Sequence, residues 1–335
     1  MGKVVTLGEI MLRLSTQQGL RLAQSEGFEA HYGGGEANVA ISLANYGHEV
    51  AFASKVPENS LGEAVKRHLQ RYGVATNFLL QGGPRLGTYY MESGIGERAA
   101  SVIYDRAGSS FAGMQEVEWD MAKLFDHVDI FHISGITPAL SANWRKLTLT
   151  LMQAAKKAGC KISFDINYRG KLWTQKEAGE TLQDLLPLVD YCSAGKMDAL
   201  YLLGIPEMPK EQPNEAIYYY QKMQELFPNI QVFYSTKREV YSASANQLIG
   251  TLWMENQYYE SQAHRIDPIV DRVGGGDAFS GGVLHGLLNK DAPQSIINFA
   301  TAASALKHTI HGDCNQFSQT EVESFLAAGS GKIIR

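Results

Sequence analysis

Two stretches of the chain place three consecutive glycines before an acidic residue and an apolar, helix-like run. The later stretch is VGGGDAFSGGVLHGLL, residues 273–288, and the earlier one is GGGEAN, residues 33–38. A helix N-terminus presents unpaired backbone N–H groups and a partial positive charge, and glycines let an anion approach that backbone closely. Gly274, Gly275 and Gly276 therefore form a candidate anion cradle.

Asp277 follows the later glycines directly and has two interpretations. Its carboxylate could cap the backbone or interact with the helix dipole, or it could act as a general base beside an anion site. The local pattern leaves both open. The second run, Gly33 to Gly35, favours the functional interpretation, because two such runs before two helices suggest a ligand approached by backbone from more than one side. Asn38, after the earlier glycines, is either a ligand contact or an ordinary first-turn residue.

Common nucleotide and hydrolase motifs are missing from the chain. The first predicted strand is followed by LGEIML rather than GxGxxG, and neither GxxxxGK[ST] nor HExxH nor GxSxG is present. A dinucleotide-dependent dehydrogenase and a P-loop ATPase are therefore disfavoured.

Composition excludes several further classes of protein. The net charge of −5 over 335 residues provides no broad basic field, so we expect neither a nucleic-acid nor an acidic-lipid partner. No stretch approaches the ~18 apolar residues of a membrane span. The cysteines are Cys160, Cys192 and Cys314, with no CxxC pair, which predicts a reducing compartment and no zinc site. The expected location is the cytoplasm.

Strand-like and helix-like runs alternate along most of the chain, which predicts an α/β fold with a mainly parallel sheet covered by helices on both faces. In the second predicted helix, Ser60 and Glu63 match a capping box, and Gly47 and Gly73 close the first two helices. The predicted strands are 3–8, 49–56, 128–135, 160–167 and 230–236, and the predicted helices are 37–47, 59–73, 142–158, 175–187, 277–289 and 293–308.

Two segments interrupt this alternation. Residues 12–32 and 79–112 alternate polar and apolar positions and carry turn residues, which is typical of antiparallel strands and hairpins. They predict a small β lid that is discontinuous in sequence, within a single domain spanning residues 1–335.

These stretches together resemble the ribokinase (PfkB-type) family of sugar kinases. DRVGGGDAFSGG (271–282) matches the family's late signature, and GGGEANVAISLANYG (33–47) matches its early one. The resemblance covers nearly the whole chain and implies a three-layer α/β/α ribokinase-like fold with a β lid. It also implies ATP and Mg²⁺ as cofactors, Asp277 as general base, and the N–H groups of Gly274 to Gly276 as an anion hole.

Within the family, three stretches are similar to 2-keto-3-deoxygluconate kinases: YDRAGS (104–109), HISGITPALS (132–141) and SFDINYRGKLW (163–173). A sugar-acid substrate needs compensating cations, and an arginine can engage a carboxylate through a planar two-bond fork. Arg106 and Arg169 are the candidates.

The resemblance extends substrate contact to further positions, each with a plainer alternative. Arg106 could be a solvated lid residue, and Arg169 could be a structural ion-pair partner of Asp165. The tyrosines could be ordinary lid aromatics, and the last aspartate a loop cap. The substrate-binding residues implied by the resemblance are Gly33, Gly34, Asn38, Tyr89, Tyr104, Arg106, Arg169, Asp277 and Asp313.

The nucleotide side departs from the family pattern in two places. GKMD (195–198) stands where the family has Asn-x-x-Glu, and STKREVYS (235–242) has Lys237 and Val240 where the nucleotide loop has glycines. The implied nucleotide contacts are Asp198, Ser235, Lys237, Gly274 and Gly276.

These departures keep two alternatives open. One is another sugar kinase of the same fold, such as a fructokinase or ribokinase. The other is a non-catalytic sugar-acid sensor that lost its nucleotide site. The resemblance further implies a homodimer formed through the lid.

Overall fold

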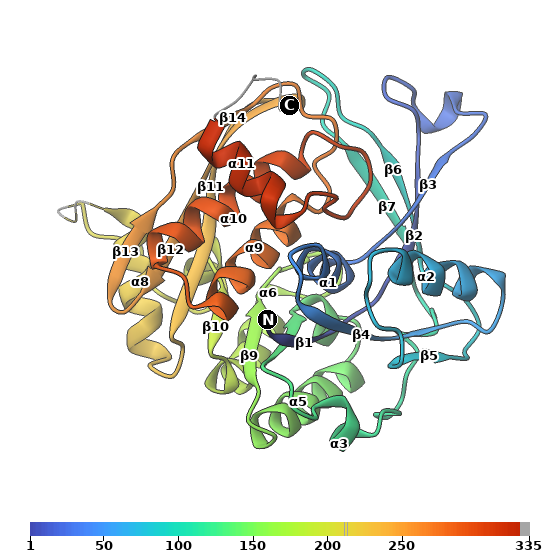
Figure 1. Ribbon diagram of the computed structural model, residues 1–335, viewed down its shortest axis with the longest axis horizontal. Helices are drawn as coiled ribbons and strands as arrows, with labels where there is room; N and C mark the ends of the chain where they lie inside the picture. Colours follow the sequence, from blue (N-terminus) through green and yellow to red (C-terminus); the bar gives the residue numbers. More distant parts are fainter. Residues whose placement is uncertain (211, 213, 329–335) are drawn as a thin grey trace.

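A large, mostly parallel sheet runs through the protein (Figure 1). The structure is a computed structural model that describes residues 1–210, 212 and 214–328. In this part of the chain the strand order is β13-β12-β11-β10-β9-β8-β1-β4-β5, with β14 also paired to β12. The strands from β11 to β5 run parallel, whereas β12, β13 and β14 add antiparallel pairings. Their bounds are β1 Lys3–Leu7, β4 Glu49–Val56, β5 Leu79–Gln81, β8 Ile130–Ser134, β9 Lys161–Asp165, β10 Tyr191–Ser193, β11 Val232–Ser242, β12 Ala245–Met254, β13 Gln257–Glu260 and β14 His264–Ile266.

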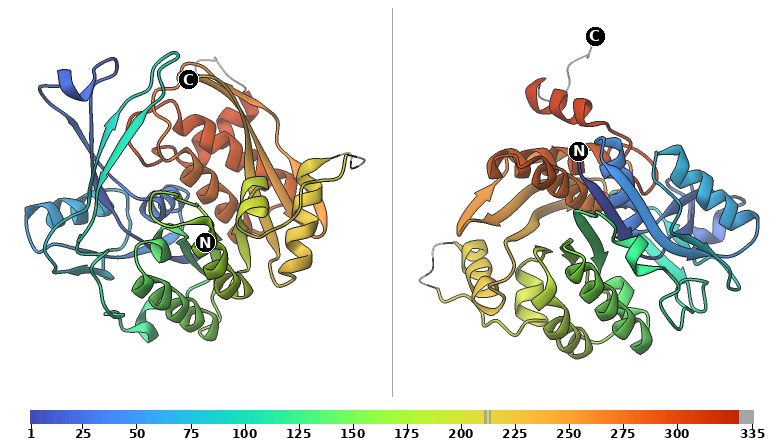
Figure 2. Two further views of the ribbon diagram at one scale, coloured as in Figure 1. Left: turned by 180° about the vertical axis from the view of Figure 1, so that it is seen from behind. Right: turned by 60° about the horizontal axis from the view of Figure 1, so that its bottom comes forward.

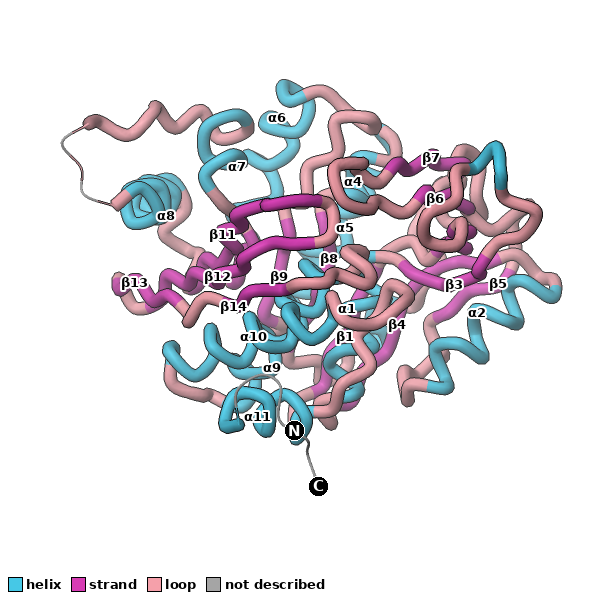
Figure 3. Tube along the Cα trace, turned by 90° about the horizontal axis from the view of Figure 1, so that it is seen from above, coloured by secondary structure: helices cyan, strands magenta, loops and turns pink. Residues whose placement is uncertain are grey.

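Helices cover both faces of this sheet, as the alternation predicted (Figures 2 and 3). Every residue of β8 is buried, as expected for a parallel strand covered on two sides. One face carries α1 (Gly35–Asn45), α2 (Ser60–Arg71), α9 (Gly275–Asn289) and α10 (Pro293–Lys307), with α11 (Gln319–Ala328) packed on α10. The other face carries α3 (Met121–Leu124), α5 (Ala142–Lys157), α6 (Gln175–Leu185) and α8 (Glu215–Leu226), while the short helices α4 (Ile136–Ala139) and α7 (Lys196–Tyr201) follow β8 and β10.

The capping signals of the sequence are partly confirmed. Gly47 and Gly73 both adopt positive φ after α1 and α2, the left-handed conformation that ends many helices. The capping box assigned to Ser60 and Glu63 is wrong. The side chain of Asn59 caps α2 instead, accepting hydrogen bonds from the backbone N–H groups of Leu61 and Gly62, because an asparagine one position earlier is a strong N-cap.

The two interrupting segments supply a second, four-stranded sheet, which we call the lid. It contains β2 (Met11–Ser15), β3 (Glu29–Gly33), β6 (Thr88–Glu92) and β7 (Ser101–Asp105), in the order β3-β2-β6-β7. The expectation of antiparallel strands is confirmed for the pairs β2–β3 and β6–β7, but it is wrong in two respects. β2 and β6 pair in parallel, because they come from separate segments rather than from one hairpin. β5, inside the second segment, joins the large sheet beside β4.

Strand β11 is longer than the sequence predicts, and it forms an antiparallel hairpin with β12. A strand was expected at 230–236, with a nucleotide loop after it, but β11 continues to Ser242 with β12 as its antiparallel partner. The loop expectation for 235–242 is therefore wrong. Thr236, Val240 and Tyr241 favour extended backbone, and β12 supplies their hydrogen-bond partners, so no glycine is required there.

The lid lies over the edge of the large sheet where the parallel strands end. Strands β1, β8, β9 and β10 all terminate at this edge, and α1 and α9 begin there. Ligands of open α/β sheets bind at the carboxyl ends of the strands. In the part of the chain that the structure describes, no helix has the length and apolar character needed to cross a membrane.

Candidate active site

The first glycine of the run at the start of α9 occupies a position that requires glycine. Gly274 is the N-cap of α9 and has φ +78°, a backbone conformation that residues other than glycine rarely adopt. A Cβ atom at Gly274 would also lie 1.6 Å from the backbone carbonyl oxygen of Asp313. The turn is therefore fixed by its φ angle and by close packing at the same time.

The next glycines differ in what surrounds them. Gly275 is buried against the His308 ring, where a Cβ would lie 2.4 Å from a ring carbon. Gly276 is exposed, and a Cβ there would meet no atom within 4 Å. The start of α9 is therefore open at Gly276, and a helix N-terminus is suited to bind an anion.

Asp277 lies in the first turn of α9 and contacts the helix that follows the other glycine run. Its Oδ2 accepts a hydrogen bond from Nδ2 of Asn38 at 2.7 Å. Burial raises the pKa of Asp277 to about 6, while the hydrogen bond from Asn38 opposes that rise. A carboxylate with a pKa near neutrality is suited to accept a proton from a hydroxyl group.

The two triple-glycine runs meet at Asp313. A Cβ on Gly33 would lie 2.3 Å from the Asp313 carboxylate, whose backbone carbonyl lies against Gly274. A Cβ on Gly34, the N-cap of α1, would lie 2.1 Å from the backbone carbonyl oxygen of Glu9. The predicted residues Gly33, Gly34, Gly274 and Asp313 are therefore brought together.

Both carboxylate oxygens of Asp313 have partners on the lid. Oδ1 accepts a hydrogen bond from Arg13 at 2.9 Å, and Oδ2 accepts one from the Tyr89 hydroxyl. Asp313 is 2% exposed, so it is a buried junction between lid and anion cradle. Tyr89 is buried as well, and its neighbour across the lid sheet, Tyr104, is 43% exposed with its ring centroid 5.7 Å away.

The two arginines predicted to contact a substrate carboxylate differ in their surroundings. Arg106 is buried and paired with Glu9, which also accepts a hydrogen bond from Ser109. The alternative of a solvated Arg106 is therefore wrong, because Glu9 holds its guanidinium inside the lid junction.

Arg169 is exposed, and within the described residues it has no ion pair shorter than 4.0 Å, Asp165 included. Its positive charge nevertheless acts on the carboxylates of both Asp165 and Asp277. Arg169 therefore stands close to the general-base candidate with its guanidinium exposed.

Several carboxyl groups gather at the ends of the strands. Burial raises the pKa values of Asp165 and Asp198 to about 6 each, and it also raises the pKa of Glu36, which accepts two hydrogen bonds from Ser134. The negative charges of Asp198 and Glu36 add to the rise at Asp165. A cation bound at this edge would relieve their mutual repulsion.

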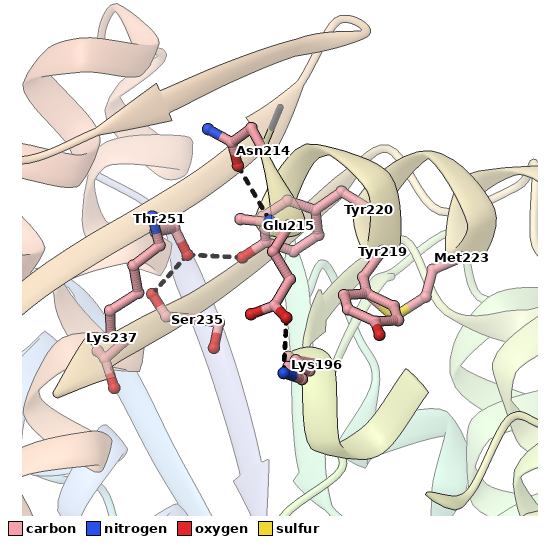
Figure 4. A pocket seen from close by; sticks show the side chains of 12 residues that line it. Lys196, Asn214, Glu215, Tyr219, Tyr220, Met223, Ser235, Lys237 and Thr251 are labelled. Carbon is pink, nitrogen blue, oxygen red and sulfur yellow. Dashed lines mark hydrogen bonds and ion pairs between the residues drawn. The ribbon is translucent and has the colours of Figure 1, made fainter. Parts of the chain in front are cut away.

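A cavity of about 450 Å³ opens beside β10 and β11 (Figure 4). Ser235 and Lys237, both predicted nucleotide contacts, line it together with Gly195. Its wall combines tyrosine rings with polar groups, a mixture that is typical of a pocket for a flat aromatic ligand. The lining residues are Gly195, Lys196, Asn214, Glu215, Ala216, Tyr219, Tyr220, Met223, Ser235, Thr236, Lys237 and Thr251.

Asp198 and Lys237 are both engaged with protein neighbours at this cavity. Asp198 Oδ2 accepts a hydrogen bond from the N–H of Gly195 at 2.9 Å and so caps α7. The Lys237 ammonium pairs with Glu260 at 2.6 Å and donates a hydrogen bond to Tyr258. Among the described residues, no cluster of three or more His, Cys, Asp or Glu side chains could hold a metal ion.

Sequence reasoning missed Arg13 and Glu9. Both lie near the first strand, in GEIMLRLS, where no glycine run or recognised motif marks them. The only signal for Arg13 was a charged side chain inside an alternating lid segment, and such residues are usually solvated. Its ionic partners, Asp271 and Asp313, are 258 and 300 residues away in the chain, so only the fold reveals them.

The sequence and the fold are similar to those of known proteins. The model of the pfkB family of carbohydrate kinases matches residues 1–320. The 2-dehydro-3-deoxygalactonokinase of Haloferax volcanii is 33% identical, with 99% of each chain covered. A solved PfkB family carbohydrate kinase from Listeria grayi is 48% identical, with a TM-score of 0.93 over 97% of this chain and 99% of its own. The solved 2-dehydro-3-deoxygluconokinase of Thermotoga maritima is 37% identical, with a TM-score of 0.94 over 98% and 100%.

Proposed function

This chain belongs to the pfkB family of carbohydrate kinases, and we propose that it transfers the γ-phosphoryl group of ATP to a hydroxyl group of 2-keto-3-deoxygluconate (2-dehydro-3-deoxygluconate). The observation that carries the choice of an acidic sugar is the exposed guanidinium of Arg169, whose charge acts on Asp277. The names of the relatives from Haloferax volcanii and Thermotoga maritima support the same substrate class.

In this proposal Asp277 accepts the proton of the attacking sugar hydroxyl. Asn38 holds Oδ2 of Asp277, which leaves Oδ1 available for the proton. As the hydroxyl oxygen bonds to the γ-phosphorus, the bond from that phosphorus to the bridging oxygen of ADP breaks. Proteins accelerate such transfers mainly by positioning the reactants and stabilising charge.

The N–H groups of Gly274, Gly275 and Gly276 would stabilise the charge on the transferring phosphoryl group. Gly276 is exposed at the start of α9, whereas the N–H of Gly275 also donates to the carbonyl oxygen of Arg272 at 3.4 Å. Preorganised donors aimed at developing charge are an effective form of catalysis. Because Gly276 is the exposed member, its N–H is the one most accessible to a phosphate oxygen.

We propose that the nucleotide base occupies the cavity bordered by Gly195, Ser235 and Tyr220. Mg²⁺ would arrive with ATP, held by phosphate oxygens and water as this ion prefers, and it would neutralise phosphate charge. Asp198 fits as an outer contact, because its carboxylate accepts a hydrogen bond from the N–H of Gly195, which lines the cavity.

Substrate recognition would be shared between the large domain and the lid. Arg169 would bind the substrate carboxylate through two hydrogen bonds from its guanidinium group. Tyr104 would contact the sugar from the lid. Arg106 would contribute indirectly, because Glu9 already holds its guanidinium. The two arginines therefore have different roles in this proposal, because only Arg169 binds the substrate carboxylate directly.

A coupled assay of ADP release tests this function with the purified protein and Mg-ATP. The acceptors are 2-keto-3-deoxygluconate, 2-keto-3-deoxygalactonate, fructose and ribose, and ³¹P NMR identifies the phosphate ester formed. We expect turnover of a keto-acid. Turnover of a neutral sugar alone would favour a fructokinase or ribokinase, and tight keto-acid binding without ATP binding would favour the sensor alternative.

A second acceptor, the galactonate-derived epimer, is favoured by one specific observation. The relative from Haloferax volcanii carries the name galactonokinase and matches 99% of the chain. The ratio of kcat/KM values for the two keto-acids in the same assay decides between them.

We also propose that two copies associate through the lid. Its strand β7 lies at the edge of the lid sheet and exposes Ile103 (52%) and Tyr104 (43%). Light scattering on the wild type and on Ile103→Glu tests this, since a dimer formed here should dissociate in the variant. A wild-type monomer at micromolar concentration would contradict it.

A further inference from the structure

The buried guanidinium of Arg13 joins the lid to the turn that forms the anion cradle. Arg13 lies on β2 of the lid and is 2% exposed. Its three nitrogens all donate hydrogen bonds: Nη1 to Asp313 at 2.9 Å, Nη2 to Asp271 at 2.7 Å, and Nε to Ser15 at 2.6 Å. Such a fork fixes direction as well as distance.

Asp271 transmits this contact to the glycine turn. Its Oδ1 accepts a hydrogen bond from the N–H of Val273 at 3.0 Å, one residue before Gly274. Its Oδ2 accepts hydrogen bonds from Arg13 and from the N–H of Gly312 at 3.1 Å. One carboxylate therefore ties the start of the cradle to the segment that carries Asp313.

Asp313 contacts both glycine runs and the lid. Its backbone carbonyl packs against Gly274, and its carboxylate packs against Gly33 while accepting from Arg13 and Tyr89. Arg13 and Tyr89 are register partners on the parallel strands β2 and β6. Two lid strands and both glycine runs thus meet at one buried junction.

Two basic side chains, Arg13 and Lys307, lie near the carboxylates of Asp271 and Asp313. Lys307 is fully buried, and burial lowers its pKa while the charges of Asp271 and Asp313 oppose that shift. Although burial disfavours its charge, the carboxylates of Asp313 and Asp271 raise the pKa of Arg13. Arg13 is the residue paired with both carboxylates, and removing one buried partner leaves the others uncompensated.

We propose that Arg13 is a positioning residue for phosphoryl transfer. By bridging Asp271 and Asp313, it holds the anion cradle and the lid in a fixed position relative to each other. It touches neither reactant and acts through the placement of the Gly274 turn relative to Asp277. A displacement of about 1 Å at a reacting centre can cost on the order of 100-fold in rate. This inference rests on the proposed kinase function.

The test uses Arg13→Lys, because a lysine keeps the charge but can reach only one of the two carboxylates. We expect kcat per folded molecule to fall about 10- to 100-fold, with KM for the sugar acid changed less than threefold, since Arg169 and Asn38 remain in place. The matched control is Arg67→Lys, which alters an exposed ion pair with Glu63 on α2 and should leave both constants unchanged. Wild-type kcat in folded Arg13→Lys would overturn the proposal.

Hydrogen exchange provides a second readout that needs no substrate, so it separates this proposal from the kinase function. In Arg13→Lys the amides of Val273, Gly312 and strand β2 should exchange faster together, while those of α5 keep their wild-type rates. Unchanged exchange at Val273 and Gly312 would reject the coupling even in an active enzyme. If the lysine variant fails to fold, Asp271→Asn, which keeps the shape of the side chain, is measured in the same way with the same two outcomes.

Discussion

Nδ2 of Asn38 donates a hydrogen bond to Oδ2 of Asp277 across 2.7 Å, joining two helix starts that are 239 residues apart in the chain. Asn38 is 3% exposed, and its Oδ1 has no hydrogen-bond partner among the described residues. A buried amide oxygen normally has one, so Asn38 keeps an unused acceptor beside the proposed base.

Removing the proposed base should nearly abolish activity. In Asp277→Asn the side chain keeps its shape but cannot accept the proton, and we expect kcat to fall about 10²- to 10⁴-fold. Steady-state ADP release measures this, with calorimetric sugar-acid binding as the check that the site is intact. A variant retaining more than a tenth of wild-type kcat would show that Asp277 acts as a helix cap only.

Asn38→Ala should reduce kcat by a smaller factor than Asp277→Asn, about 10- to 100-fold. The substitution removes the hydrogen bond from Asn38 that orients Asp277. Ser42→Ala, one turn further along α1 and buried, is the matched control. Equal losses in the two variants would point to packing of α1 rather than to orientation of the base.

The rate should depend on pH through Asp277. Its pKa is raised to about 6, and the base acts only when ionised. Activity should therefore be full above about pH 7 and fall tenfold per unit well below pH 6. Asn38→Ala should move this limb to higher pH, because the hydrogen bond that favours the ionised form is lost. A limb that stays in place would assign the titration to another group, such as Asp165 or Asp198.

Arg169→Ala should raise KM for the sugar acid by about 10- to 100-fold, corresponding to loss of a charge-assisted hydrogen bond worth roughly 1.5–3 kcal/mol. KM for ATP should stay constant. Arg67→Ala serves as an exposed arginine control. If KM for the acid is unaffected while a neutral sugar remains a poor substrate, then Arg169 does not read the carboxylate.

Filling the cavity beside β10 should weaken nucleotide binding selectively. A Cβ on Gly195 would lie 2.7 Å from Oγ of Ser235, so Gly195→Val intrudes into the pocket, and we expect KM for ATP to rise at least tenfold. Gly27→Val is the control, because a Cβ there meets no atom within 4 Å. Equal effects on ATP and sugar-acid KM would place the nucleotide base elsewhere.

Stability should fall on acidification because of buried histidines. Burial lowers the pKa of His132 to about 3 and the pKa values of His48 and His285 to about 4 each, and the charge of His285 adds to the fall at His48. A depressed pKa in the folded state gives stability that is complete above the unfolded value of about 6.5 and is lost as the pH falls toward 4. Urea unfolding at pH 7.5 and 5 measures this, and His132→Gln should reduce the difference, whereas exposed His127→Gln should not.

The sequence alone determined the layered fold and the chemical groups at the starts of α1 and α9. Alternating strand and helix runs specify a covered parallel sheet because period and length are local properties of the chain. The runs at Gly33 and Gly274 mark the starts of α1 and α9, since close backbone approach restricts these positions to glycine.

Tertiary structure alone decided how the charged groups are paired. Both Arg106 and Arg169 could have bound a substrate carboxylate, but Glu9 lies beside Arg106 and leaves Arg169 exposed. Arg13 looked like an ordinary lid residue until the fold brought Asp271 and Asp313 to it. The energy of a charge depends on its burial and on neighbours that are distant in sequence, so pairing emerges only when the lid and the large sheet are placed together.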